Sequence, residues 1–212
     1  MTDRNAPKYA IGTNNYELGK ELGKALKSQL PNGGNIIIQS GRSDSPNLNL
    51  RIMGLRSALS EKEYESPPGK RLKGENGWTE SSNPLYNFDS FSTALEDLKN
   101  VLYSHKERGI NAVVSVAGWA QFSEGYREVV EPYRQEIQNK EIVIIFADTA
   151  DKQLMYLKDG LAHTNVGQNP FEMGKQAIMT LYKLANKKSV KEIQYIPMTY
   201  CNPQNYQTCT KK

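Results

Sequence analysis

The sequence contains, at residues 141–147, the run Glu-Ile-Val-Ile-Ile-Phe-Ala, and this run decides the fold class. A short, continuous apolar run is typical of a strand that is buried on both faces of a parallel sheet. Two similar runs occur at residues 35–39 and 112–117. Each is followed by a segment whose apolar residues recur at helical spacing. The sequence therefore predicts repeated strand–helix units.

Outward from these runs, strand and helix signals alternate along the whole chain. Further strands are expected at residues 9–12, 84–88, 161–167 and 192–198. Helices are expected at residues 14–30, 47–59, 92–106, 124–138 (interrupted near Pro132), 152–159 and 170–185. This order predicts a doubly wound, mainly parallel α/β sheet with helices on both faces. No linker divides the pattern, so we expect a single α/β lobe over residues 1–212.

Residues 60–83 interrupt this alternation. They are rich in Glu, Lys, Pro and Gly, and they carry one Trp, at position 78. A loop of this length in a compact domain is usually functional or flexible. We interpret the segment as a long insertion in the lobe.

Composition excludes several classes of protein. The 212 residues are 38% hydrophobic and 24% charged, which is ordinary for a globular protein and argues against disorder, collagen and coiled coil. The longest apolar run is far shorter than the roughly 20 residues that a membrane span needs, so no direct membrane insertion is expected. The 27 basic and 23 acidic residues give a net charge of +4, and the basic residues are dispersed. We therefore expect no nucleic-acid partner.

The first eight residues lack the apolar core of a secretory leader. Two alternatives remain: a cytosolic protein, or one whose natural leader is absent from this chain.

The two cysteines, Cys201 and Cys209, stand eight positions apart near the end of the chain. With only two His residues and no zinc-binding spacing, no metal site is expected. The cysteines are either a disulfide or two unrelated thiols. Because Pro and Asn between them favour a turn, we expect a disulfide, which would contribute roughly 2–3 kcal/mol and imply an oxidising compartment.

Candidate ligand-binding residues follow the predicted strands, because ligands of open α/β sheets bind outside the carboxyl ends of the strands. Planar Asp, Asn, Gln and Arg groups, with one Trp, suit a neutral ligand with many hydroxyl groups. The candidates in and beside these loops are Arg42, Asp44, Asn47, Asn49, Arg51, Trp119, Gln121, Asp148 and Gln168.

Several of these candidates also have a purely structural explanation. Asp148 could cap a helix, Arg51 could be a solvated helix residue, and Trp119 could be part of the core. The sequence has no nucleophile elbow, no phosphate-binding loop and no dinucleotide fingerprint, so we expect neither catalysis nor a cofactor.

Several segments resemble one known family. Residues 11–19 read Ile-Gly-Thr-Asn-Asn-Tyr-Glu-Leu-Gly, and residues 166–174 read Val-Gly-Gln-Asn-Pro-Phe-Glu-Met-Gly. With the strand at 37–41, the helix at 47–56 and the segment at 147–154, they match in order and spacing the second lobe of type 1 periplasmic sugar-binding proteins. These are the ribose-binding-protein-like solute receptors of ABC transporters.

The resemblance implies a pocket made of Arg51, Trp119, Asp148 and Gln168, with Asn47 and Asn49 as weaker candidates. Arg51 and Asp148 would bind sugar hydroxyls, and Gln168 would lie at the crossover between lobes. Trp119 stands where ribose binders have an Asn, which suggests stacking on a sugar ring other than ribose.

The first lobe of such receptors would precede Tyr9 and is not in this sequence. The chain is then either a truncated or separately expressed lobe, or a natural half-receptor. The helix at 170–185 would normally pack on that lobe, and without it we expect its apolar face to favour a homodimer. The apolar residues of this face are Met173, Ala177, Ile178, Leu181 and Leu184.

The function that the resemblance implies is binding of a sugar or polyol, for uptake through an ABC transporter permease or for chemosensing, in the periplasm or another extracytoplasmic space. Two alternatives stay open: the effector-sensing domain of a lac-repressor-type transcription regulator, and an α/β enzyme.

Overall fold

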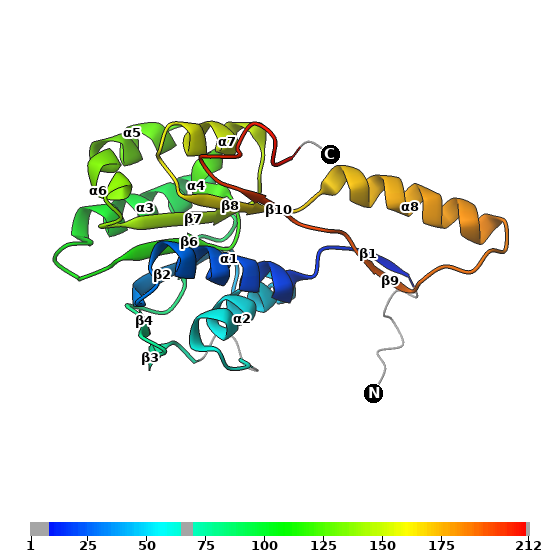
Figure 1. Cartoon of the computed structure of the whole chain (residues 1–212), viewed down its shortest axis with the longest axis horizontal. Helices are drawn as coiled ribbons and strands as arrows, with labels where there is room; N and C mark the ends of the chain where they lie inside the picture. The colour runs from blue at the N-terminus through cyan, green and yellow to red at the C-terminus, as the bar shows by residue number, and fades with distance from the viewer. Residues whose placement is uncertain (1–8, 65–69, 211–212) are drawn as a thin grey trace.

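The computed structural model describes residues 9–64 and 70–210 of the chain. Among these residues eight strands form one sheet in the order β10-β8-β7-β6-β2-β4-β3, with β5 beside β2 (Figure 1). The central strands β2, β6, β7 and β8 are parallel to one another. Their bounds are Gly34–Ser40, Ala112–Ser115, Val143–Ala147 and Thr164–Gly167. The predicted fold class, a mainly parallel α/β sheet, is confirmed.

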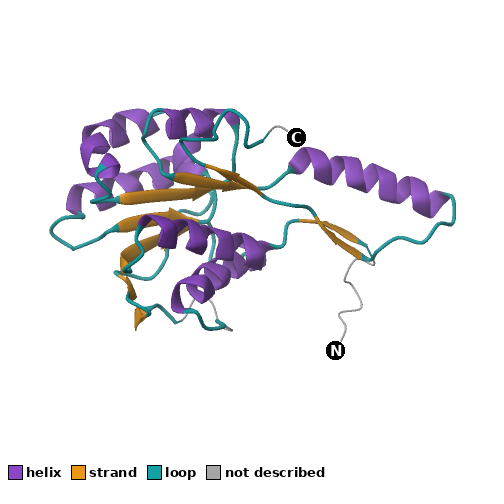
Figure 2. Cartoon of the chain, in the orientation of Figure 1, coloured by secondary structure: helices purple, strands orange, loops and turns teal. Residues whose placement is uncertain are grey.

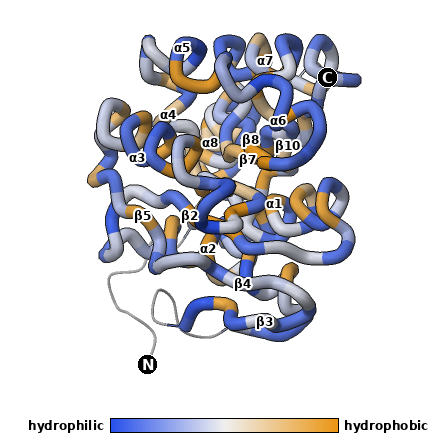
Figure 3. Tube along the Cα trace, turned by 90° about the vertical axis from the view of Figure 1, so that its left-hand side faces the viewer, coloured by the Kyte–Doolittle hydropathy of each residue, from blue (hydrophilic) through white to orange (hydrophobic). Residues whose placement is uncertain are grey.

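Helices cover both faces of this sheet (Figures 1 and 2). One face carries α1 (Asn15–Gln29) and α2 (Pro46–Ser60). The other carries α3 (Phe91–Ser104), α4 (Trp119–Phe122), α5 (Tyr126–Val130), α6 (Arg134–Gln138) and α7 (Asp151–Lys158). A 3-10 turn at Glu131–Tyr133, which contains Pro132, separates α5 from α6 where the interruption was predicted. Figure 3 shows the hydrophobic segments gathered between the two helix layers.

The helices α1 and α2 pack closely against each other next to the carboxyl ends of the parallel strands. A Cβ atom on Gly54 would lie 1.9 Å from the Tyr16 carbonyl oxygen, and one on Gly19 would lie 2.0 Å from the Arg51 carbonyl oxygen. Only glycine permits such an approach of two helix backbones. The two glycines therefore bring Arg51 against the beginning of α1.

The insertion at residues 60–83 is more ordered than a loop, although its residues 65–69 lie outside the described part of the chain. It forms β3 (Lys73–Glu75) and β4 (Trp78–Glu80), which extend the edge of the sheet next to β2. Asn76 and Gly77, both with positive φ, make the turn between these strands. An Asn-Gly pair between short strands is a strong hairpin signal, and the sequence interpretation did not use it.

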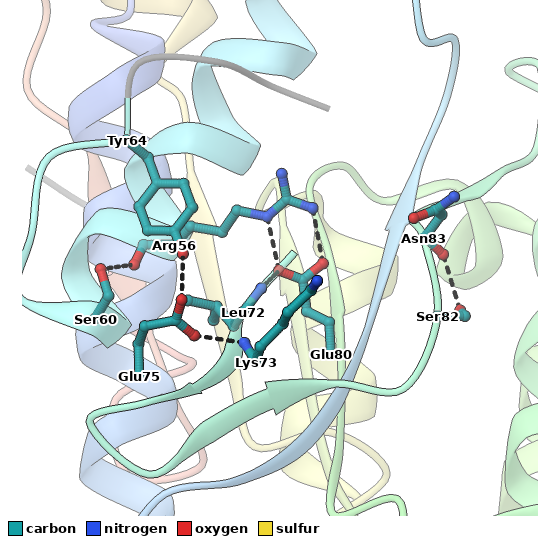
Figure 4. Close-up of polar contacts among 9 residues, drawn as sticks. All are labelled: Arg56, Ser60, Tyr64, Leu72, Lys73, Glu75, Glu80, Ser82 and Asn83. Carbon is teal, nitrogen blue, oxygen red and sulfur yellow. Dashed lines mark hydrogen bonds and ion pairs between the residues drawn. The ribbon is translucent and has the colours of Figure 1, made fainter. Parts of the chain in front are cut away.

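A buried ion pair fastens this hairpin to α2. Arg56 Nε and Nη2 each donate to the Glu80 carboxylate at 2.7 Å, and both side chains are fully buried (Figure 4). Glu80 Oε1 also accepts from the Leu72 backbone N–H at 3.0 Å. Removal of one partner would leave a buried charge without its counter-ion, so the pair fixes where the insertion sits.

A second region, which we call the arm, extends from the main sheet and its helices, which we call the body (Figures 1 and 2). The arm consists of β1 (Ala10–Gly12), α8 (Pro170–Ala185) and β9 (Ile193–Tyr195). The strands expected at 9–12 and 192–198 do form, but they pair in parallel with each other in a separate two-stranded sheet. The chain then returns to the body as β10 (Thr199–Cys201), an unpredicted strand antiparallel to β8.

The stripe expected on α8 is split between two environments. Met173, Ala177 and Leu184 are half-buried on the side of Thr180, whose hydroxyl accepts from Gln194 Nε2 of β9 at 3.0 Å. Ile178 and Leu181 are exposed instead, together with Phe171, Met179 and Tyr182. The arm therefore covers one side of α8 and leaves the other side apolar and open.

Within the described residues, no helix is both long enough and apolar enough to cross a lipid bilayer.

Candidate functional site

Asp148 stands directly after β7, at the carboxyl edge of the sheet. Its backbone has φ 70°, a left-handed conformation that is uncommon for residues other than glycine. Its Oδ2 accepts from the Gly118 backbone N–H at 3.1 Å, and its Oδ1 accepts from Gln168 Nε2 at 3.2 Å. The carboxylate is thus held between the loops that follow β6 and β8.

Gln168 links this edge to the segment that joins the arm to the body. It follows β8, and its Oε1 accepts from Thr13 Oγ1 at 3.0 Å. Thr13 lies between β1 and α1. A chain of hydrogen bonds therefore runs from Thr13 through Gln168 and Asp148 to Gly118.

Arg51 of α2 lies beside this chain and is 4% exposed. Its Nε donates to Asn15 Oδ1 at 2.9 Å, and its Nη1 donates to the Val116 carbonyl oxygen at 2.8 Å. Burial lowers the pKa of Arg51, and the nearby Asp148 carboxylate opposes that shift. The guanidinium stays protonated, because the ordinary arginine pKa is so high. Arg51 therefore brings a fixed positive charge close to Asp148.

A second corner of the edge forms around Gly41, which follows β2. A Cβ atom there would lie 2.3 Å from Asp89 Oδ1 and 2.8 Å from Trp119 Cζ2, so both side chains converge on this point. Trp119 is only 8% exposed and packs in the hydrophobic core. In the described structure its indole is therefore not presented as an open stacking face.

Phe88 supplies an exposed aromatic ring at the same corner. It follows β5 (Leu85–Tyr86), is 69% exposed and has φ 54°, and Asp89 has φ 63°. The Phe88 N–H donates to the Gly41 carbonyl oxygen at 3.0 Å, which fixes the loop on β2. Left-handed backbone at two consecutive residues is strained, and such strain is often found at ligand sites.

The two asparagines of α2 differ. Asn47 is exposed, and its side chain makes no hydrogen bond with any described residue, so it is free to meet a ligand. Asn49 is half-buried, and its Nδ2 donates to the Ser43 carbonyl oxygen at 2.8 Å. Asn49 therefore stabilises the loop that precedes α2.

Of the three remaining candidates, two are exposed and one is buried. Arg42 and Asp44 are exposed and form an ion pair with each other at 3.1 Å. Gln121 is fully buried behind the site.

Four residues at this edge were not among the candidates: Thr13, Asn15, Phe88 and Asp89. Phe88 and Asp89 follow a predicted strand, so the rule that ligands lie at strand ends could have found them. Thr13 and Asn15 are far from Gln168 and Arg51 in sequence, and their side chains meet only through the fold.

Cys201 and Cys209 form a disulfide with a Cα–Cα distance of 5.4 Å. Within residues 9–64 and 70–210, no group of His, Cys, Asp or Glu side chains is arranged to hold a metal ion.

Solved structures share this fold. GanP, a glucose-galactose binding protein from Geobacillus stearothermophilus, is 22% identical, matches 96% of this chain and 65% of its own, and has a TM-score of 0.76. An ABC transporter solute binding protein from Agrobacterium vitis with bound D-fucose is 18% identical and matches 98% and 66% of the two chains, with a TM-score of 0.77. One from Actinobacillus succinogenes with bound D-allose is 18% identical and matches 94% and 62%, with a TM-score of 0.74.

This chain therefore spans less than two thirds of the length of GanP. A search of the curated proteins found no match. The family model of the periplasmic binding protein domain, in contrast, matches residues 2–189, which is most of the chain. The chain belongs to the periplasmic binding protein domain family.

Proposed function

We propose that this chain is a non-catalytic carbohydrate-binding module, which binds a sugar or polyol at the carboxyl edge of its sheet. The observation that carries the proposal is the hydrogen-bonded set of Asp148, Gln168 and Thr13 with the Arg51 charge beside it. Carboxylate, amide and guanidinium groups on rigid elements suit a ligand that offers several hydroxyl groups in a fixed geometry. Three similar structures support the same class of ligand: one is a glucose-galactose binding protein, and two contain bound D-fucose and D-allose.

Each group at the edge has a proposed role. Asp148 accepts from sugar hydroxyls, Arg51 places a positive charge beside the Asp148 carboxylate, and Gln168 offers its amide at the crossover to the arm. Asn47, with no partner in the described structure, adds a donor and an acceptor. The exposed ring of Phe88 takes the stacking role that the sequence suggested for Trp119.

We further propose that the body is one lobe and that the arm belongs to a second one. A two-stranded sheet is marginally stable by itself, and parallel strands normally have both faces covered. The match covers 65% of the GanP chain. In a receptor of that length, the unmatched part could supply further structure around β1, α8 and β9. In such a receptor the module would deliver its ligand to an ABC transporter permease. A sensor role is the alternative that the family resemblance leaves open. One similar structure is described as the XylFII-LytSN complex.

An extracytoplasmic location follows from the same proposal. The family is extracytoplasmic in bacteria, and a disulfide persists in an oxidising compartment.

Calorimetry with D-glucose, D-galactose, D-fucose and D-allose at millimolar concentration tests the proposed ligand class. For a sugar that binds, Asp148→Ala should weaken binding by about 2–4 kcal/mol, because sugar hydroxyls are left without their buried partner. Asp151→Ala, an exposed carboxylate at the start of α7, is the matched control and should leave affinity unchanged. Equal affinity of the Asp148→Ala variant and the unmodified chain would contradict the role of Asp148.

A further inference from the structure

Three buried side-chain amides lie behind Asp148, on elements that come from separate parts of the sequence. Gln121 belongs to α4, Gln153 to α7 and Asn165 to β8. Each is 0% exposed. None of them can reach a ligand directly, so any effect on binding passes through other residues.

The three amides satisfy one another. Gln121 Oε1 accepts from Gln153 Nε2 at 2.7 Å and from Asn165 Nδ2 at 2.8 Å. Gln121 Nε2 in turn lies 3.5 Å from Asn165 Oδ1. Buried polar networks of this kind are rigid when every member is paired, because an unpaired amide inside the protein is costly.

The other hydrogen bonds of the network are made with backbone groups of the loop that carries Asp148. Asn165 Nδ2 donates to the Asp148 carbonyl oxygen at 2.8 Å. Gln153 Nε2 donates to the Ala147 carbonyl oxygen at 3.1 Å, and Gln153 Oε1 accepts from the Ala150 N–H at 2.9 Å. The amides thus hold backbone groups before, at and after the residue with φ 70°.

The same network reaches the donor that faces the Asp148 carboxylate. A Cβ atom on Gly118 would lie 2.6 Å from Gln153 Nε2, so Gly118 packs directly on the Gln153 amide. The Gly118 N–H is the group that donates to Asp148 Oδ2. Gln153 therefore contacts Gly118 and also bonds the backbone of Ala147 and Ala150, on either side of Asp148 in the sequence.

We propose that Gln121, Gln153 and Asn165 are positioning residues that hold Asp148 in its left-handed conformation and aim its carboxylate at the ligand. The inference deepens the proposed sugar site and rests on it for its consequence in binding. The coupling of the three amides to the Gly118–Asp148 hydrogen bond does not depend on a ligand and can be tested without one.

The first experiment measures hydrogen exchange of the Gly118 amide by NMR in the full chain without ligand. Gln153→Met removes one amide of the network at similar length. Asn111→Leu is the matched control, because the Asn111 side-chain oxygen accepts from the Asn35 N–H at 2.8 Å just before β6 begins, at the end of this strand away from Gly118 and outside the network. We expect Gly118 to exchange about tenfold faster in Gln153→Met, as for the loss of roughly one buried hydrogen bond, and not in Asn111→Leu at equal global stability.

Equal exchange of Gly118 in both variants would overturn the proposal. If Gln153→Met does not fold, Asn165→Leu, which removes the donor to the Asp148 carbonyl oxygen, is compared with Asn111→Leu in the same way. Calorimetry with D-galactose then separates the two proposals. If the unmodified chain binds no sugar of the panel while Gly118 responds as expected, the proposed function fails and the positioning role stands. If sugar binds, Gln153→Met should weaken it about tenfold, and an unchanged affinity would overturn the positioning role in binding.

Discussion

The body and the arm differ in how far their apolar side chains are exposed. All five residues of β7 in the body are buried between two helix layers. In the arm, Phe171 is 82% exposed, and Ile178 and Leu181 are 70% and 66% exposed. An apolar hollow of about 500 Å³ lies on the same helix and is lined by Phe171 and Ile178 together with Pro170 and Met179. The body thus has a sheet that is covered on both faces, whereas the arm has an exposed apolar face, which is typical of a surface that packs against another structure.

The sharpest test of this difference is one pair of identical substitutions. Phe146→Ala in β7, where the ring is fully buried, should lower the free energy of unfolding by about 3–5 kcal/mol, through lost burial and the cavity that remains. Phe171→Ala in α8 should change it by less than about 0.5 kcal/mol. Urea denaturation followed by circular dichroism measures both. A large loss for Phe171→Ala would show that the arm is integral to the fold of the lone chain.

A pH dependence of stability should also arise in the body. Burial lowers the pKa of His163 from 6.5 to about 4, and Nδ1 of this ring accepts from the Ile144 N–H. Because the unfolded chain binds the proton more readily, the contribution of His163 is complete above pH 6.5 and is lost as the pH falls towards 4. The shift corresponds to about 3 kcal/mol.

Urea denaturation of the unmodified chain and of His163→Gln between pH 7 and pH 4 isolates this contribution. The variant should lose less stability than the unmodified chain over the interval. The same slope in both proteins would remove His163 as the cause.

The disulfide should stabilise the strand by which the chain returns from the arm. Cys201 is buried in β10 and bonded to Cys209 eight residues later. Reduction should cost about 2–3 kcal/mol of unfolding free energy, as expected for so short a loop on the chain-entropy account. Mass spectrometry should find the non-reduced chain about two mass units lighter than the reduced one, as loss of two hydrogens requires. Two freely alkylated thiols in protein from an oxidising compartment would contradict both the bond and the proposed location.

The smallest expected effect is on association of the chain with itself. With the arm uncovered, we expect the isolated chain to form a homodimer at micromolar concentration, since burial of each large apolar side chain contributes about 1.5–3 kcal/mol. Leu181→Asp should raise the dissociation constant about tenfold or more without changing the unfolding free energy of the monomer. Light scattering over a concentration series measures this. A monodisperse monomer that Leu181→Asp destabilises would place the helix in its own lobe instead.

The body was predictable because its signals are local. Buried runs such as residues 141–147 and the helical spacing of apolar residues set the parallel sheet, and Pro132 marked the break between α5 and α6. The pairing of β1 with β9 was not predictable, because about 180 residues separate two short strands whose partners depend on the fold around them.

The candidate site divides in the same way. Arg51, Asp148 and Gln168 could be chosen as ligand candidates because their loops follow predicted strands. The left-handed conformation of Asp148 and the amides behind it were not visible, because they arise from contacts among four distant segments. The burial of Trp119 and the exposure of Phe88 likewise depend on how the loops after β2, β5 and β6 pack together.

We propose that the carboxyl edge of the body, and not the arm, recognises a sugar. An NMR titration of the full chain with D-galactose and the other sugars of the panel tests it most directly. We expect the backbone amide signals of Gly118, Asp148 and Gln168 to shift with a common saturation curve, while those of α8 from Lys175 to Leu184 do not shift. Shifts confined to α8, or no shift with any sugar at millimolar concentration, would contradict it.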